Sequence, residues 1–286
     1  MTSPAPLRTA TVNGLEIAYR DRGDPRAPAL VLLHGFPGSS DTFAPLLDQL
    51  PTDVRVIAPD YPGFGASASL SSPATFDTLS EHIELLLAEL DVKSFTLYMF
   101  DFGGPVGMRL VERDATRIAG LIFQNANIYS DGLGPGFTGL QGYWAAPEQL
   151  RPRLRSALLS AEGITRQHLA GATHPDLVDQ AVIGRAIADH AGSARQEAVL
   201  DLLLDYQHNV TAYRRWEELV AELDVPVLAI WGEHDPIFTR DGALGLSRHA
   251  RHLTSVLLDA GHFAALEQPA QVAQAVQELL TAMSPR

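Results

Sequence analysis

Three residues of this chain, Asp101, Asp235 and His262, each follow a run that is predicted to be a buried strand. An aspartate is ionised at pH 7, so Asp101 could attack an electrophilic carbon without help from a base. A histidine held by a second carboxylate could then activate a water molecule. A simpler role for Asp101 is to cap the helix that is predicted to begin near Gly103.

The candidate nucleophile stands at the apex of a sharp turn. Residues 94–100 are rich in β-branched and aromatic side chains and predict a strand, whereas residues 106–111 predict a helix. Gly103 is the small residue expected two positions after a nucleophile in such a turn, but Met99 stands where another small residue is expected. No Gly-x-Ser-x-Gly motif occurs in the chain. Carboxylate chemistry is therefore the first hypothesis for this turn.

The second carboxylate has competitors. Asp235 lies in the sequence Gly-Glu-His-Asp-Pro, so Glu233 is an alternative, and Asp131 follows the preceding predicted strand. Asp235 is favoured because the Gly and Pro around it indicate a tight turn. His262 follows Ala-Gly at the end of the last predicted strand, which is the position expected of a catalytic histidine.

The order of the predicted elements indicates an α/β fold. Residues 9–12 and 15–20 predict a hairpin around Asn-Gly, and residues 76–90 have the apolar spacing of a helix. Strands are predicted at residues 29–33, 54–58, 94–100, 118–123, 225–231 and 253–258, and a last helix at 270–283. Strands that alternate with helices imply a mostly parallel, twisted sheet with helices on both faces.

The strand signal stops between residues 128 and 216, where helices are predicted at 147–159, 175–188 and 195–206. We therefore expect a core of residues 1–127 and 217–286, with residues 128–216 inserted as a helical lid. Ligands of such sheets bind at the carboxyl ends of the strands, which is the edge this lid would cover.

Composition narrows the class of protein. The chain has 286 residues, a formal charge of −13 and no cysteine, which argues against a nucleic-acid surface and against thiolate metal sites or disulfides. Neither a signal peptide nor an apolar run of about 18 residues is apparent, so we expect a cytoplasmic protein without membrane partners. His168 with His174, and His249 with His252, lack the further ligands of a metal site, so we expect no metal and no cofactor.

These motifs resemble the α/β-hydrolase superfamily, and within it the aspartate-nucleophile branch of epoxide hydrolases and haloalkane dehalogenases. The resemblance runs from the His-Gly-Phe-Pro motif at residues 34–37 through Asp101 to His262, which is nearly the whole chain. Typical members have a small residue and a histidine before the nucleophile, where this chain has Met99 and Phe100.

The resemblance implies a mechanism in two steps. Asp101 would attack carbon and become an alkyl ester, and water activated by His262 and Asp235 would cleave that ester. The backbone N–H groups of Phe36 and Phe102 would stabilise the oxyanion. The implied substrate is a small apolar organic molecule, with water as co-substrate.

The two reactions that this resemblance implies differ in the atom that leaves the carbon. An epoxide oxygen needs proton donors, and the lid tyrosines of epoxide hydrolases suggest Tyr143 and Tyr213 for that role. A halide needs N–H donors, but Phe36 and Phe102 stand where dehalogenases have them, and Trp144 alone could donate from the lid. We therefore expect epoxide hydrolysis, with a dehalogenase as the alternative.

Further residues are expected at the substrate. Phe137 and Trp144 suggest an apolar pocket under the lid, although they could equally form lid core. The resemblance adds His34 and Phe263 as neighbours of the substrate. A hypothesis of another class is a non-hydrolytic binder or lyase on the same scaffold, because a fold alone does not determine function.

Overall fold

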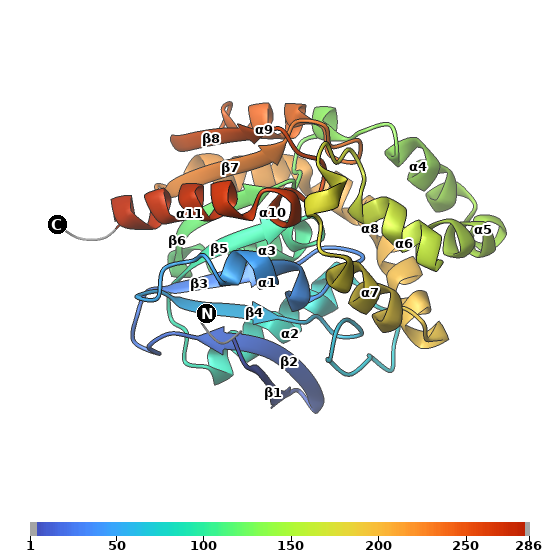
Figure 1. Ribbon diagram of the computed structural model, residues 1–286, viewed down its shortest axis with the longest axis horizontal. Coiled ribbons are helices and arrows are strands. Elements are labelled where there is room, and N and C mark those ends of the chain that lie inside the picture. Colours follow the sequence, from blue (N-terminus) through green and yellow to red (C-terminus); the bar gives the residue numbers. More distant parts are fainter. Residues whose placement is uncertain (1–4, 284–286) are drawn as a thin grey trace.

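The computed structural model describes residues 5–283, and its centre is one eight-stranded sheet in the order β1-β2-β4-β3-β5-β6-β7-β8 (Figure 1). Strands β1 and β2 form the expected hairpin, β2 pairs with β4 antiparallel, and all other pairs are parallel. The strands are β1 Leu7–Val12, β2 Leu15–Arg22, β3 Ala29–Leu33, β4 Arg55–Pro59, β5 Phe95–Phe100, β6 Ile118–Gln124, β7 Pro226–Gly232 and β8 His252–Leu258. The predicted mostly parallel sheet with helices on both faces and a helical insert is confirmed.

The central strands are buried on both faces, as their continuous apolar sequences predict. In β3, Leu30 and Leu32 belong to one hydrophobic core, whereas Val31 and Leu33 belong to the other. Each face is covered by helices. Helices α1 Ala44–Leu47, α10 Ala264–Glu267 and α11 Pro269–Met283 cover one face, and α2 Phe76–Glu89, α3 Gly103–Arg113 and α9 Arg240–Leu246 cover the other.

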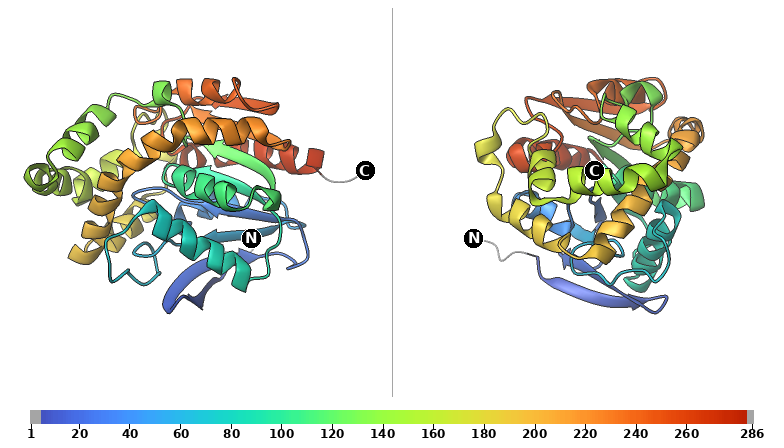
Figure 2. Two further views of the ribbon diagram at one scale, coloured as in Figure 1. Left: turned by 180° about the vertical axis from the view of Figure 1, so that it is seen from behind. Right: turned by 90° about the vertical axis from the view of Figure 1, so that its right-hand side faces the viewer.

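Five helices lie between β6 and β7 in the described chain. All but the later part of the last one project beyond one end of the sheet, at the right of Figure 1 and facing the viewer in the right-hand view of Figure 2, and that later part runs back along a face of the sheet in the left-hand view. They are α4 Phe137–Ala145, α5 Pro147–Leu159, α6 Ala161–His168, α7 Gln180–Asp189 and α8 Ser193–Glu222. The helix predicted at 195–206 is thus a rod of 30 residues, and the lid boundary expected at residue 216 falls inside it. Spacing could not predict its length, because its buried residues change from lid contacts to core contacts along the rod.

Candidate active site

Asp101 occupies the turn between β5 and α3, where its φ is +49°. Left-handed backbone is uncommon outside glycine, and strain of this kind is concentrated at functional sites. Two glycines permit the tight packing around it: a Cβ on Gly103 would collide with the Leu33 carbonyl, and one on Gly35 with the Asp101 side chain. The N-cap of α3 is Phe102, and no side chain caps the helix. The capping role considered for Asp101 therefore does not hold.

The two unusual residues before Asp101 are both accommodated. Met99 is fully buried against Gly107 of α3, where an added Cβ would lie 2.5 Å from the Met99 sulfur. Phe100 faces the opposite core and packs on His262 and Phe263, with ring centroids 5.0 and 4.9 Å away. The bulk at position 99 is thus matched by a missing side chain at position 107. Phe100 supports the histidine through an apolar ring contact.

Asp101, Asp235 and His262 converge at the carboxyl edge of the sheet. His262 Nδ1 donates a hydrogen bond to Asp235 Oδ2 over 2.7 Å, and its Nε2 lies 3.6 Å from Asp101 Oδ2. The second distance is longer than a hydrogen bond. The other Asp235 oxygen accepts the backbone N–H groups of Ile237 at 2.7 Å and Phe238 at 3.2 Å. These contacts fix the imidazole so that Nε2 faces the candidate nucleophile.

The competing carboxylates point elsewhere. Glu233 lies 3.5 Å from Arg240 at the surface, and Asp131 accepts two hydrogen bonds from Arg248, at 2.7 and 3.0 Å. Of the candidates weighed from the sequence, Asp235 is the one that contacts His262.

The sequence reasoning missed a further polar residue, Asn125, directly after β6. Its Nδ2 donates to Asp235 Oδ2 over 2.8 Å, and its Oδ1 accepts the Gly232 N–H at 3.1 Å and the Gln124 side-chain amide at 2.9 Å. Gln124 also donates to the His262 carbonyl at 3.2 Å. Asn125 has a φ of +45°, a conformation that asparagine tolerates better than most residues. An asparagine at the end of a predicted strand was the available signal.

The charges of the site depend on one another. Burial alone would lower the pKa of His262, but the Asp235 and Asp101 carboxylates outweigh it and raise that pKa to about 10. Burial raises the pKa of Asp101, while His262 and the backbone N–H of Phe102 hold it down. The resting site is therefore best described as an imidazolium between two carboxylates. Part of the stabilisation of that cation comes from the negative charge on Asp101.

A cavity of about 320 Å³ opens onto Asp101 beneath the lid. A water molecule occupies about 30 Å³ of the liquid, so the space equals roughly ten waters. Its walls are mainly apolar, and they are formed by Phe36, Asp101, Phe102, Gly136, Phe137, Gly139, Leu140, Leu154, Leu158, Arg166, Gln167, Ala170, Leu203, Tyr206, Ile237 and Phe238. Asp101 Oδ1 is buried and has no hydrogen-bond partner among the described residues. The carboxylate oxygen is thus free to react.

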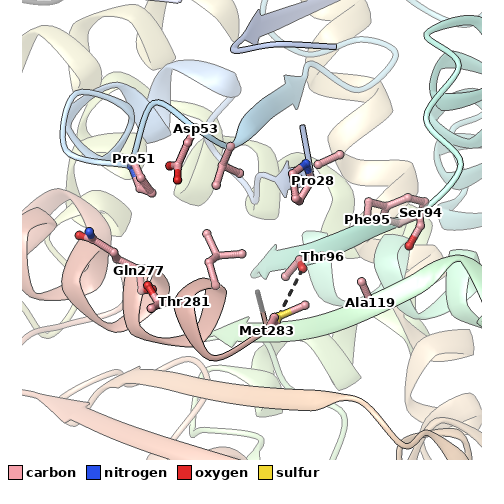
Figure 3. A pocket seen from close by; sticks show the side chains of 13 residues that line it. Pro28, Pro51, Asp53, Ser94, Phe95, Thr96, Ala119, Gln277, Thr281 and Met283 are labelled. Atoms are coloured by element: carbon pink, nitrogen blue, oxygen red, sulfur yellow. Dashed lines mark hydrogen bonds between the residues drawn. The ribbon is translucent and has the colours of Figure 1, made fainter. Parts of the chain in front are cut away.

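A larger cavity of about 410 Å³ lies at the opposite edge of the sheet, between Pro28, Thr96 and the end of α11 (Figure 3). Its side chains include Thr96, whose hydroxyl lies 3.9 Å from the Met283 sulfur. The triad lies at the other ends of the strands, so size alone does not identify the reactive cavity.

A family model for the alpha/beta hydrolase fold matches residues 28–269. The chain belongs to this family. It is 35% identical to an uncharacterized hydrolase of Saccharomyces cerevisiae over 257 residues, which are 88% of this chain and 89% of the relative. It is also 23% identical to epoxide hydrolase 3 of Xenopus tropicalis over 286 residues, covering 94% of this chain and 75% of that protein.

The fold of this α/β-hydrolase is also similar to that of the haloalkane dehalogenase DatA from Agrobacterium tumefaciens C58. The TM-score is 0.84 at 19% identity, over 99% of this chain and 98% of the dehalogenase. At this identity the similarity shows the fold alone. By sequence, epoxide hydrolases and haloalkane dehalogenases are both distant homologues of this hydrolase.

The lid tyrosine that lines the cavity of the hydrolase is Tyr206. The expected site residue Tyr143 instead donates to the Leu200 carbonyl over 3.2 Å and accepts from Arg151 at 3.1 Å, inside the lid. The structure thus places Tyr143 outside the cavity wall, a position that helical spacing could not predict because it does not reveal which side of α4 faces α8. The Tyr213 hydroxyl lies behind Tyr206, with 3.3 Å between the two oxygens.

Tyr206 is a buried phenol whose pKa is affected by an anion, Asp101, and a cation, Arg109. Burial raises its pKa well above the ordinary value, the Tyr213 hydroxyl and Asp101 raise it further, and Arg109 lowers it. Tyr206 therefore stays protonated and can donate. Tyr206 and Tyr213 are seven residues apart, which is two turns of one helix. That spacing is the signal that could have paired them from the sequence.

The other residues expected at the substrate divide into two groups. Phe137 lines the cavity, and so do the rings of Phe36 and Phe102, which stack with centroids 5.9 Å apart. Trp144, by contrast, donates its indole N–H to the Leu203 carbonyl over 2.8 Å and is not part of the lining.

His34 and Phe263 lie behind the site and not in the cavity wall. His34 Nδ1 lies 3.0 Å from the Gly35 carbonyl, and Nε2 accepts the Tyr61 backbone N–H at 3.3 Å. Burial lowers the pKa of His34 to about 3, so its ring is neutral and holds the shape of the loop that carries Phe36. Phe263 packs against the His262 ring, with centroids 5.3 Å apart. Both residues support the site from behind the cavity wall.

Within residues 5–283, no group of three or more His, Asp or Glu side chains is placed to hold a metal ion. Of the helices in the same range, none is both long enough and apolar enough to cross a membrane.

Proposed function

We propose that this α/β-hydrolase converts epoxides to vicinal diols through an ester on Asp101. The observation that carries the proposal is the pairing of a free carboxylate oxygen of Asp101 with the Tyr206 phenol in one apolar cavity. Carboxylate attack on a ring carbon breaks a C–O bond, and the departing oxygen needs a proton. Tyr206 supplies it, and the contact with Tyr213 orients the Tyr206 hydroxyl.

The charges of the site allow the protons to balance over one cycle. The resting site holds anionic Asp101, protonated His262 and neutral Tyr206. Alkylation neutralises Asp101 and leaves a phenolate on Tyr206, so the imidazolium loses part of its stabilisation and returns a proton to the phenolate through the cavity. Neutral His262 then takes a proton from the water that attacks the ester carbonyl. Cleavage releases the diol and regenerates the aspartate beside an imidazolium.

The halide reading is less well supported. A departing halide is stabilised by N–H donors, and indoles are the usual source in the resembling dehalogenases. Here the N–H of Trp144 is bound to Leu203 O, that of Trp231 donates to the Phe238 carbonyl over 2.8 Å, and Trp216 is outside the cavity wall. The cavity therefore offers a phenol and no indole N–H among its described lining residues.

The decisive experiment traps the ester. In a His262→Gln variant the second step is blocked, so styrene oxide should add its mass to the peptide that contains Asp101, as detected by mass spectrometry. An adduct with 1-bromobutane and none with epoxides would support the dehalogenase instead. No adduct with a panel of epoxides and alkyl halides would favour a binder or lyase.

A matched pair of variants tests whether Tyr206 acts as the general acid. Tyr206→Phe should slow alkylation of Asp101 by styrene oxide about 100-fold, the lower end of the usual effect of a general acid. Tyr143→Phe removes an equally buried lid phenol outside the cavity and should leave alkylation unchanged. Equal rates for both variants would remove Tyr206 from the mechanism.

A further inference from the structure

A buried cation lies behind Tyr206 and has no place in the two steps described above. Arg109 belongs to α3, the helix that follows Asp101, and its side chain is only 9% exposed. The guanidinium lies over two rings, 5.7 Å from the centre of Phe76 and 5.4 Å from that of Trp216. Burying a charge is costly, so a guanidinium in this position needs compensation.

The contacts of Arg109 connect it to α8, the helix that carries Tyr206. Its Nη1 donates to the Asn209 side-chain oxygen over 2.8 Å and to the Pro105 carbonyl over 3.1 Å. Asn209 lies on α8 one turn after Tyr206, and its Nδ2 is buried without a hydrogen-bond partner among the described residues. Phe76 packs edge-on against Tyr206, with centroids 5.6 Å apart. Arg109 and Tyr206 therefore contact the same Phe76 ring, and the amide that Arg109 binds lies one turn after Tyr206 on α8.

The counter-ion of Arg109 is Asp77, which lies toward the protein surface. Arg109 Nε lies 2.5 Å from Asp77 Oδ1, but the Asp77 side chain is 70% exposed. Water screens an exposed charge far more than a buried one. The field of the guanidinium therefore reaches the buried Tyr206 hydroxyl less attenuated than the field of Asp77 does.

We propose, on the basis of the proposed function, that Arg109 is a positioning residue that stabilises the negative charge formed on Tyr206 when this tyrosine protonates the opening epoxide oxygen. The groups around Tyr206 fit this role. The Tyr213 hydroxyl and Asp101 oppose ionisation of Tyr206, and Arg109 favours it. The carboxylate of Asp205, the preceding residue of α8, accepts a hydrogen bond from the Phe76 backbone N–H at 2.8 Å and contacts the His208 ring at 2.8 Å.

A direct test measures the ionisation of residue 206 in the full-length protein. Tyr206 is replaced by 3,5-difluorotyrosine, whose phenol ionises at lower pH, and the transition is followed by ¹⁹F NMR. Arg109→Met should raise the midpoint by about one pH unit, since a nearby opposite charge shifts a pKa by one to three units. Arg109→Lys keeps the charge and should restore most of the shift.

The control is Arg113→Met, one turn further along α3. Arg113 contacts α2 as Arg109 does, with 2.8 Å to the Ser80 hydroxyl and 3.5 Å to Glu84. Within residues 5–283 its hydrogen bonds and ion pairs go to α2 and not to α8. Its removal should leave the midpoint unchanged. An unchanged midpoint in folded Arg109→Met protein, or a shift that Arg109→Lys does not reverse, would overturn the proposal.

Kinetics then link the charge to catalysis. In the His262→Gln background, Arg109→Met should slow alkylation by styrene oxide about tenfold, and Arg109→Lys should recover most of that loss. If no epoxide alkylates the parent protein, the proposed function fails, while the titration still decides whether Arg109 controls Tyr206. A normal alkylation rate together with a shifted midpoint would exclude Arg109 from the reaction.

Discussion

Replacing Asp101 by asparagine should lower the pKa of His262 and so reduce the positive charge on its imidazole at neutral pH. Asparagine has nearly the same shape as aspartate, tolerates the left-handed backbone at this position and is neutral, so it imitates the charge state of the proposed ester intermediate. The lost charge lies 3.6 Å from His262 Nε2. At an effective dielectric constant of about 20, a pair at this distance interacts by about 4.6 kcal/mol, equivalent to roughly three pKa units.

The pKa of His262 should therefore fall from about 10 to about 7 in Asp101→Asn. Imidazole ¹⁵N chemical shifts, recorded against pH, measure both values. Because the base must be neutral, the same reasoning predicts that ester cleavage in the unmodified enzyme speeds up as pH rises through about 7. Asp131→Asn removes an exposed carboxylate and should not move the midpoint. A change of less than half a unit in Asp101→Asn would refute the idea that alkylation switches the histidine into a base.

The remaining predictions concern residues that support Asp101, Asp235 and His262. Asn125→Leu should destabilise the fold by about 2 kcal/mol in chemical denaturation, because it leaves buried partners unsatisfied, and should slow ester cleavage more than alkylation. Gly35→Ala should abolish ester formation in the trapping assay with circular dichroism unchanged, because its Cβ would collide with Asp101. Gly107→Ala should destabilise by about 1–3 kcal/mol through overpacking, and Met99→Ala by about 2–5 kcal/mol through a cavity. The double variant should lose less than the sum, whereas additive losses would mean that the two sites are independent.

Much of the core could be predicted because its signals are local. Continuous apolar runs identified the parallel strands, and the acid at the end of one of them identified the turn at Asp101. The order of nucleophile, acid and histidine along the chain was enough to select His262. These residues are positioned by the ends of strands. Asp101 and Asp235 follow strands that are buried on both faces, whereas His262 follows the largely exposed β8 and was selected by its place in the order of motifs.

The lid was harder because helical spacing does not determine rotation about the helix axis. Tyr143 and Tyr206 are both buried aromatic residues, and only the packing of α4 against α8 decides which one reaches the cavity. The effect of Met99 could not be judged either, because its compensation lies eight residues away at Gly107, across a strand-to-helix turn. Asn125 was missed because its role depends on a partner more than 100 residues later in the chain.

The long helix α8 belongs both to the cavity wall and to the core. Its first half passes over the cavity with Tyr206, and its second half is anchored in the core by the buried Trp216. The proposed proton donor is therefore carried by a helix that is anchored in the same core as Asp101, while the outer wall of the cavity is supplied by the shorter helices α4, α5 and α6. In the proposed reaction, substitutions that loosen those three helices should alter how quickly the diol leaves, yet keep the geometry in which the carbon–oxygen bond is opened.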